Sequence, residues 1–247
     1  MGFYLSSSLV FLFGLAVGSF LNVVIYRMPR GESVITPPSA CPSCGNRLKW
    51  YHNIPLLSWI VLGGKCGFCK ARISPRYPAV EILNAALWLV IFFKTGPVWY
   101  FPFVASTFSA LFALSMIDFE YYAVPDILNF FALGAALVQP DFPHACLNAA
   151  IAAGGLWALA KAISLATGKE AMGGADVIVA GTMAALLGLI YFFEAIFISA
   201  LLAIAPSMAA RDKETMVPFV PFLAMGTLIM YLFGAEITDF VKWVIYE

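Results

Sequence analysis

Long apolar stretches recur along the whole chain and are separated by short segments that hold most of the charged residues. The hydrocarbon core of a bilayer is about 30 Å thick, and a helix of about 20 residues crosses it. Because lipid offers the backbone no hydrogen-bond partners, such stretches are predicted to be helices. Eight spans are predicted, at residues 4–24, 79–93, 97–117, 127–139, 145–165, 177–193, 195–210 and 217–234. Since 127–139 is short and Glu194 alone separates the sixth span from the seventh, this count is open by one.

The composition agrees with this pattern, because 62% of the residues are hydrophobic and only 11% are charged. A soluble domain carries about 25% charged residues. The sequence therefore predicts an all-α polytopic membrane protein that is surrounded by lipid. No basic residue precedes the first stretch and no small-residue cleavage site follows it, so we expect a retained span rather than a signal peptide. Two glycine pairs, Gly14 with Gly18 and Gly154 with Gly155, are predicted to let helices pack closely.

Residues 27–78 differ in kind from the rest of the chain, since they hold four cysteines, several prolines and most of the basic residues. We expect three parts: a first helix at 1–26, a small cytoplasmic domain at 27–78 and a transmembrane domain at 79–247. Basic residues mark the cytoplasmic side of a membrane protein, which places the N-terminus outside. The basic residues of this segment are Arg27, Arg30, Arg47, Lys49, Lys65, Lys70, Arg72 and Arg76. When the eight predicted spans are followed along the chain, four more basic residues lie on the cytoplasmic side or at its edge, namely Lys161, Lys169, Arg211 and Lys213. Lys94 and Lys242 lie on the opposite side of the membrane.

Four cysteines form two C-x2-C motifs, Cys41-Pro-Ser-Cys44 and Cys66-Gly-Phe-Cys69, with 21 residues between them. Four thiolates at this spacing can converge tetrahedrally on one zinc ion. A redox pair and disulfides are the alternatives, although a cytoplasmic location disfavours disulfides. With four sulfur ligands no position is left for water, so the zinc is expected to be structural. Cys146 stands alone in an apolar span and is expected to be a core residue.

Two acidic residues interrupt apolar stretches, and ionisable residues in a membrane need a reason. Asp118 ends one predicted span, and Asp176 begins another. Both would lie at the cytoplasmic ends of their helices, where two carboxylates could face each other beside water. Such a pair shares a proton, so that one member can activate a water and the other can donate a proton. The alternative is that they are helix caps or solvated residues, as expected for Asp126 after Pro125.

Other catalytic classes fit the sequence poorly. The two histidines, His52 and His144, fall on opposite sides of the membrane in the predicted topology, which disfavours a Ser-His-Asp site or a histidine-rich metal site. The sequence has no H-E-x-x-H motif, no Walker loop and no G-x-G-x-x-G after a strand. No nucleic-acid partner is expected.

Several motifs together resemble the type IV prepilin peptidases, a family of aspartyl membrane proteases with a G-x-G-D motif. The resemblance covers most of the chain. Asp118 is followed after six residues by Pro125-Asp126, and Gly173-Gly-Ala-Asp176 stands at the G-x-G-D motif. The other motifs are the paired C-x2-C motifs, Gly18-Ser-Phe-Leu-Asn-Val-Val-Ile-Tyr-Arg-Met-Pro29, Asn53-Ile-Pro-Leu-Leu-Ser58, Ile73-Ser-Pro-Arg-Tyr-Pro-Ala-Val-Glu81 and Pro218-Phe-Val-Pro-Phe222.

The resemblance implies that Asp118 and Asp176 are the catalytic pair and that the four cysteines bind zinc. It implies an endopeptidase of the bacterial inner membrane that removes basic leader peptides from prepilins or type II secretion pseudopilins. Cleavage would follow a glycine and precede an apolar helix. Family members often also methylate the new N-terminus, with S-adenosylmethionine as the donor.

The chain departs from the family pattern at two positions. Ala175 replaces the glycine that is usual before the second aspartate, which restricts the backbone at positive φ. Ile178 stands where a lysine is common, which removes a charge partner for Asp176.

Two other interpretations remain open. An aspartyl protease of the presenilin or signal peptide peptidase type is not expected to carry the four cysteines. A non-catalytic, zinc-containing assembly factor of a pilus or type II secretion system would need Cys41 but would tolerate replacement of Asp118.

Overall fold

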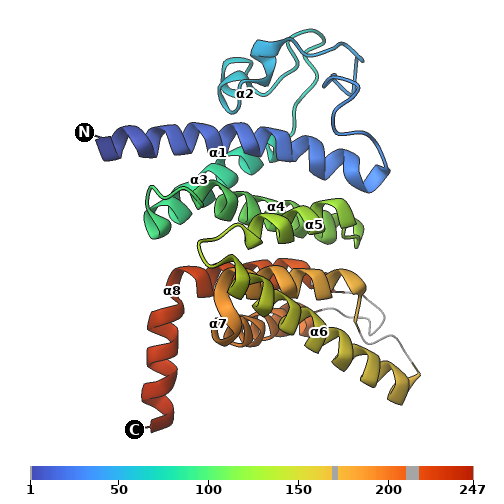
Figure 1. Ribbon diagram of the computed structural model, residues 1–247. Helices are drawn as coiled ribbons and strands as arrows, with labels where there is room; N and C mark the ends of the chain where they lie inside the picture. Colours follow the sequence, from blue (N-terminus) through green and yellow to red (C-terminus); the bar gives the residue numbers. More distant parts are fainter. Residues whose placement is uncertain (1, 169–171, 210–216, 247) are drawn as a thin grey trace. The chain divides into compact units, whose positions relative to one another are not determined.

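The computed structural model describes residues 2–168, 172–209 and 217–246, which form helices joined by loops (Figure 1). Lys169, Arg211 and Lys213, which entered the predicted topology, lie outside the described residues. The described segments contain no extended strand, only two isolated bridges in the cysteine segment. The predicted all-α class is therefore confirmed. The helices are α1 (Gly2–Arg27), α2 (Leu57–Val61), α3 (Arg76–Thr95), α4 (Phe101–Tyr121), α5 (Asp126–Leu137), α6 (Phe142–Thr167), α7 (Gly174–Ala209) and α8 (Val220–Tyr246), with short 3-10 helices η1 (Met28–Arg30) and η2 (Trp50–Asn53).

The helices form two compact units, Met1–Val98 and Trp99–Glu247. In the first unit α1 packs along α3, and the cysteine segment connects these two helices. In the second unit α7 contacts α5, α6 and α8, while α4 contacts α5 and α8. Asp118 and Asp176 both belong to the second unit. The predicted division at 26/27 and 78/79 stays a prediction.

Six of the described helices are long and apolar enough to cross a membrane, namely α1, α3, α4, α6, α7 and α8. Helix α5 is apolar but has only 12 residues. The expected break at Glu194 is not observed there, because α7 runs through this residue and leaves helical geometry at Gly188, with φ 74° and ψ 166°. A positive φ of this kind suits glycine, which has no Cβ. The described helices thus do not establish the predicted count of eight spans.

Two glycines in α1 allow close contact with α3. A Cβ added at Gly14 would lie 2.7 Å from the Cα of Ala85, and one at Gly18 would lie 2.7 Å from the Cα of Glu81. The expectation for this glycine pair is confirmed. It is wrong for Gly154 and its neighbour in α6, where no described atom lies within 4 Å of an added Cβ.

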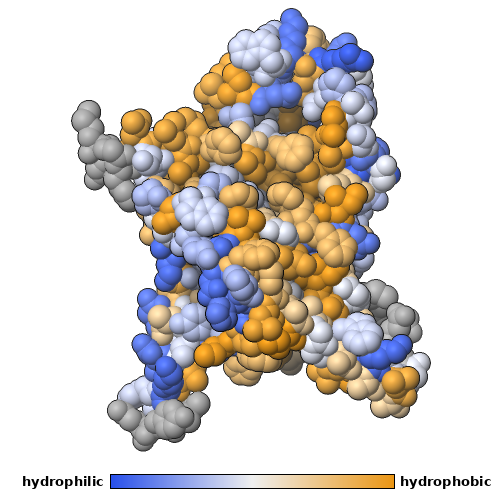
Figure 2. Space-filling model, viewed as in Figure 1, coloured by the Kyte–Doolittle hydropathy of each residue, from blue (hydrophilic) through white to orange (hydrophobic). Residues whose placement is uncertain are grey.

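Large apolar side chains cover much of the molecular surface. Figure 2 shows hydrophobic residues over most of the face turned to the viewer. On α1, for example, Leu5, Leu9 and Phe13 are exposed by 59% or more. Soluble monomers rarely expose contiguous apolar patches of more than a few hundred Å². These side chains therefore need a lipid environment, as in a multi-pass membrane protein.

We predict that Gly18→Ala destabilises the first unit, because its new methyl group meets backbone atoms of α3 that cannot rotate away. Overpacking of this kind costs about 1–3 kcal/mol, which should lower the unfolding temperature in detergent by several degrees. Gly154→Ala is the matched control, and its unfolding temperature should stay the same or rise, since alanine favours a helix over glycine. Equal unfolding temperatures for the two variants would contradict the packing described here.

Candidate active site and metal centre

Asp118 is positioned by the last turn of α4. The preceding turns bury Leu111, Leu114 and Ile117, each no more than 1% exposed, and this anchors the end of the helix in the core of the second unit. The helix ends at Tyr121, and the next residue, Tyr122, has a left-handed backbone (φ 51°) and donates its N–H to the Asp118 carbonyl at 2.9 Å. The Asp118 residue is only 7% exposed. A carboxyl group buried to this degree needs a hydrogen-bond partner.

The Asp118 carboxylate finds this partner at the start of α8. Its Oδ2 atom accepts the backbone N–H of Val220 at 3.1 Å, across 102 residues of sequence. The first N–H groups of a helix have no partner within the helix, and its N-terminus favours negative charge. Asp118 thus caps a helix to which it does not belong. The motif Pro218-Phe-Val-Pro-Phe222 supplies this N-terminus.

Asp176 lies in the first turn of α7 and is half-buried. Its N–H donates to the carbonyl of Gly173 at 3.2 Å, and a Cβ added at Gly173 would lie 3.6 Å from Asp176 Oδ2. Helix α5 follows α4 along the chain and contacts both α4 and α7, so it connects the two helices that carry the aspartates. The catalytic role of the pair stays a prediction.

Asn129 is a buried polar residue that the sequence analysis missed. It lies in the first turn of α5, is 0% exposed, and donates Nδ2–H to the carbonyl of Ala175 at 3.0 Å. The available signal was an asparagine inside an apolar stretch, three positions after Asp126. Ala175 does not have a positive φ, so replacing the usual glycine causes no strain there.

The four cysteines of the two C-x2-C motifs converge on one point. Their Sγ atoms all lie within 4.8 Å of one another, and those of Cys41 and Cys69 are 3.8 Å apart. A tetrahedral site with metal–sulfur distances of about 2.3 Å requires sulfurs about 3.8 Å apart. All four cysteines are free, and the 3.8 Å between Cys41 and Cys69 is too long for a disulfide bond, which needs about 2.05 Å. The cluster therefore fits one tetrahedral metal ion.

Backbone N–H groups surround these sulfurs, as expected for metal-binding knuckles. The N–H groups of Cys69 and Phe68 lower the pKa of Cys66 to about 6, and Phe68 N lies 3.4 Å from Cys66 Sγ. The N–H of Asn46 lowers the pKa of Cys44. The N–H of Ala71 acts in the same sense on Cys69, but desolvation and the three neighbouring sulfurs raise its pKa to about 11. Thiolates so close together repel one another, and a bound cation would remove this repulsion.

The remaining cysteine and the histidines do not join either cluster. Cys146 lies in α6, half-buried and outside the group of four. His52 stacks edge-on against Phe68, with ring centroids 5.3 Å apart. His144 is exposed and pairs with Asp141 at 2.7 Å, which lowers the pKa of Asp141.

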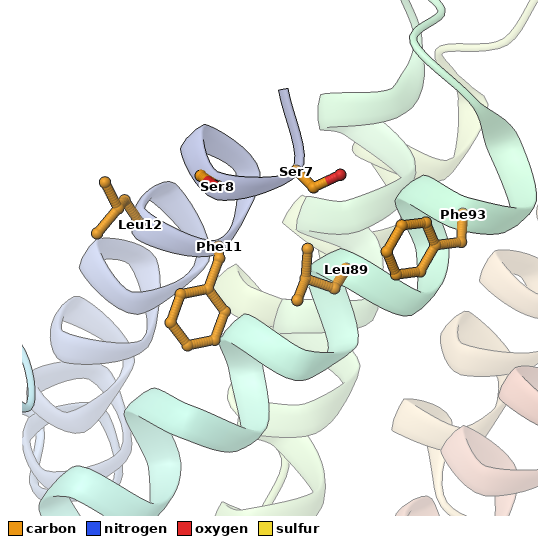
Figure 3. Close-up of a pocket in the computed structure, with 6 residues that line it drawn as sticks. All are labelled: Ser7, Ser8, Phe11, Leu12, Leu89 and Phe93. Carbon is orange, nitrogen blue, oxygen red and sulfur yellow. The ribbon is translucent and has the colours of Figure 1, made fainter. Parts of the chain in front are cut away.

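An apolar cavity of about 410 Å³ lies in the first unit between α1 and α3. Figure 3 shows its lining. The lining residues are Ser7, Ser8, Phe11 and Leu12 of α1 with Leu89 and Phe93 of α3. None of them is ionisable, so this cavity offers no acid–base chemistry.

Two family models match the chain in succession. The first is described as the bacterial peptidase A24 N-terminal domain and matches residues 12–95. The second is described as the type IV leader peptidase family and matches residues 105–208. The first match includes the four cysteines, and the second includes Asp118 and Asp176.

Curated relatives are similar over nearly the whole chain. The prepilin leader peptidase/N-methyltransferase of Pseudomonas aeruginosa is 31% identical, over 92% of this chain and 90% of its own length. The protein of the same name from Dichelobacter nodosus is 34% identical, over 92% and 91%. The one from Myxococcus xanthus is 41% identical over a shorter match, with 58% of this chain and 44% of its own length. No solved structure is significantly similar to the chain.

We predict that the purified protein binds about one metal ion per chain, since four sulfurs complete one tetrahedral site. Cys66→Ser should lose most of this metal, because it replaces a buried thiolate by a poor ligand. Cys146→Ser, a cysteine outside the cluster, is the matched control and should keep it. Elemental analysis of protein purified in detergent measures the metal content. Full metal content in Cys66→Ser would show that the four cysteines are not its ligands.

Proposed function

Since the chain belongs to the type IV leader peptidase family, we propose that it is an aspartic endopeptidase that removes leader peptides from type IV prepilins or pseudopilins. The observation that carries this proposal is the placement of Asp118 and Asp176. These residues come from distant motifs, and they lie at the ends of two helices, α4 and α7, that both pack against α5. The curated relatives are named for the same activity.

The proposed chemistry uses the two carboxyl groups as one unit. When they share one proton, the ionised member accepts a proton from a water molecule, whose oxygen attacks the carbonyl carbon of the scissile peptide bond. The protonated member donates to the carbonyl oxygen, on which negative charge develops. A proton then passes to the leaving amine as the C–N bond breaks. The dyad titrates as a pair, so neither aspartate is assigned a separate role.

The placement of the two aspartates suits a substrate that crosses from water into lipid. Asp118 lies in the last turn of α4 and Asp176 in the first turn of α7, so both are near the ends of apolar helices. A prepilin combines a basic leader with an apolar helix, and its cleavage site after a glycine lies where the two meet. In this proposal the chain lies in the bacterial inner membrane, with its N-terminus outside and the aspartates on the cytoplasmic side.

We propose that the metal ion held by Cys41, Cys44, Cys66 and Cys69 is zinc, which prefers tetrahedral thiolate sites. Four sulfurs leave no open position, so the ion would crosslink its loops and take no part in cleavage. The relatives' names also include N-methyltransferase. A methyl transfer from S-adenosylmethionine to the new N-terminus is therefore a second proposed activity. Mass spectrometry of the cleaved product, with and without the donor, tests it separately.

We predict that Asp118→Asn and Asp176→Asn each lower the rate of prepilin cleavage about 100-fold or more, since either change removes acid–base chemistry. The assay is cleavage of a purified prepilin in detergent, followed by gel shift and mass spectrometry. Asp141→Asn changes an exposed aspartate between α5 and α6 and should cleave at the wild-type rate.

Wild-type cleavage by either the Asp118 or the Asp176 variant would disprove the catalytic pair. A different outcome would support the alternative. If the wild-type protein does not cleave the prepilin, while Cys41→Ser abolishes pilus assembly in cells, the chain would be a non-catalytic assembly factor.

A second prediction concerns the N–H group that Asp118 accepts. Val220→Pro removes this donor, yet proline is well tolerated at the first position of a helix. We expect cleavage to slow roughly 10- to 100-fold, because the carboxylate loses its fixed orientation. Val220→Ala removes the same isopropyl group but keeps the N–H, so its rate per folded molecule should stay close to wild type. Equal cleavage rates for the proline and alanine variants would contradict this role.

A further inference from the structure

Asn129 makes a hydrogen bond that stability alone does not explain. Its side chain is fully buried in α5, and its Oδ1 atom has no hydrogen-bond partner among the described residues. A buried polar group without a partner costs free energy, and an apolar residue of the same shape avoids that cost. We therefore expect the asparagine at this position to serve a purpose other than stability, through the hydrogen bond that its Nδ2–H group donates.

The other half of this amide holds the segment that carries Asp176. Nδ2 donates to the carbonyl oxygen of Ala175 at 3.0 Å, and Ala175 directly precedes Asp176. The orientation of the amide follows from chemistry, because a carbonyl oxygen needs a donor and Oδ1 would repel it. A carbonyl oxygen has two lone pairs, so it can accept this bond in addition to a bond within the helix.

Asn129 is itself held firmly. Its own N–H donates to the carbonyl of Pro125 at 3.1 Å, in the first turn of α5. The same helix contacts α4, which carries Asp118. A rigid element with contacts to both aspartate-bearing helices can fix the distance between them.

We infer that Asn129 is a positioning residue, which fixes the backbone at Ala175 and thereby holds Asp176 in place opposite Asp118. This inference rests on the proposed peptidase function. Asn129 would not touch the substrate or exchange protons with it. Its loss should therefore lower kcat and leave KM nearly unchanged.

Asn129→Leu tests this role, because leucine has a similar size and removes both the donor and the unpaired acceptor. We expect its unfolding temperature to equal or exceed that of the wild type, while kcat for prepilin cleavage falls at least tenfold and KM changes less than threefold. The matched control is Asn84→Leu in the first unit. Asn84 is also 0% exposed and donates Nδ2–H to a backbone carbonyl, that of Gly14, at 2.8 Å. This control should lose stability and keep kcat per folded molecule.

A second pair of variants keeps the test decisive if the leucine variant does not fold. Asn129→Gln and Asn129→Met have nearly the same shape, but only glutamine has an amide N–H that can donate to the Ala175 carbonyl. We expect the glutamine variant to retain a higher kcat than the methionine variant at equal unfolding temperatures. Wild-type kcat in the leucine variant, or equal kcat in the glutamine and methionine variants, would overturn the inference.

The Asp118→Asn and Asp176→Asn variants belong in the same assay. If both cleave normally, the proposed function fails. If both are inactive while the Asn129 variants cleave at the wild-type rate, only the positioning role fails.

Discussion

The second unit depends on backbone N–H groups that compensate for a buried carboxyl group. Asp118 is enclosed by an apolar helix bundle, where an unpaired carboxylate would be very unfavourable. The N-terminus of α8 supplies Val220 N–H to its Oδ2 atom, and the same contact satisfies one of the unpaired donors of α8. The carboxylate thus gains a donor, and the first turn of α8 gains an acceptor. The contact joins the end of α4 to the start of α8 across 102 residues of sequence.

This arrangement also shows that one aspartate can cap a helix and still be a candidate for catalysis. From the sequence the two roles are alternatives for Asp118, because a sequence pattern predicts a cap only for the helix that the residue adjoins. In the structure Asp118 caps a different helix, and its own helix α4 packs against α5, which also contacts the helix that carries Asp176. Fixing a reactive carboxylate with a backbone donor gives it a defined orientation without adding a titratable neighbour.

The sequence predicted the helical class, the cysteine cluster and the two aspartates because each has a local signature. Apolar runs identify membrane helices, and paired C-x2-C motifs identify a four-sulfur site. The contacts of Val220 and Asn129 could not be predicted in this way, since a backbone N–H has no signature and an asparagine acquires its role only from the residue it meets. The helix break was placed at Glu194, the one charged residue in that run. The backbone instead departs at Gly188, since a positive φ depends on the missing Cβ and not on polarity.

The glycine contact between α1 and α3 has a consequence for the segment between them. Because these helices touch at Gly14 and Gly18, they can associate whether or not the cysteines are bound to an ion. The segment is then a loop whose two ends are fixed by the helices. The entropy cost of bringing these ends together arises when the helices associate, before any ion binds. Loss of the ion would loosen this loop and leave the helix pair standing. The loop is still coupled to the helix pair at one point, because the buried Glu81 carboxylate of α3 accepts the backbone N–H of Leu56 at 2.6 Å, so a shortened loop would have to keep a donor there.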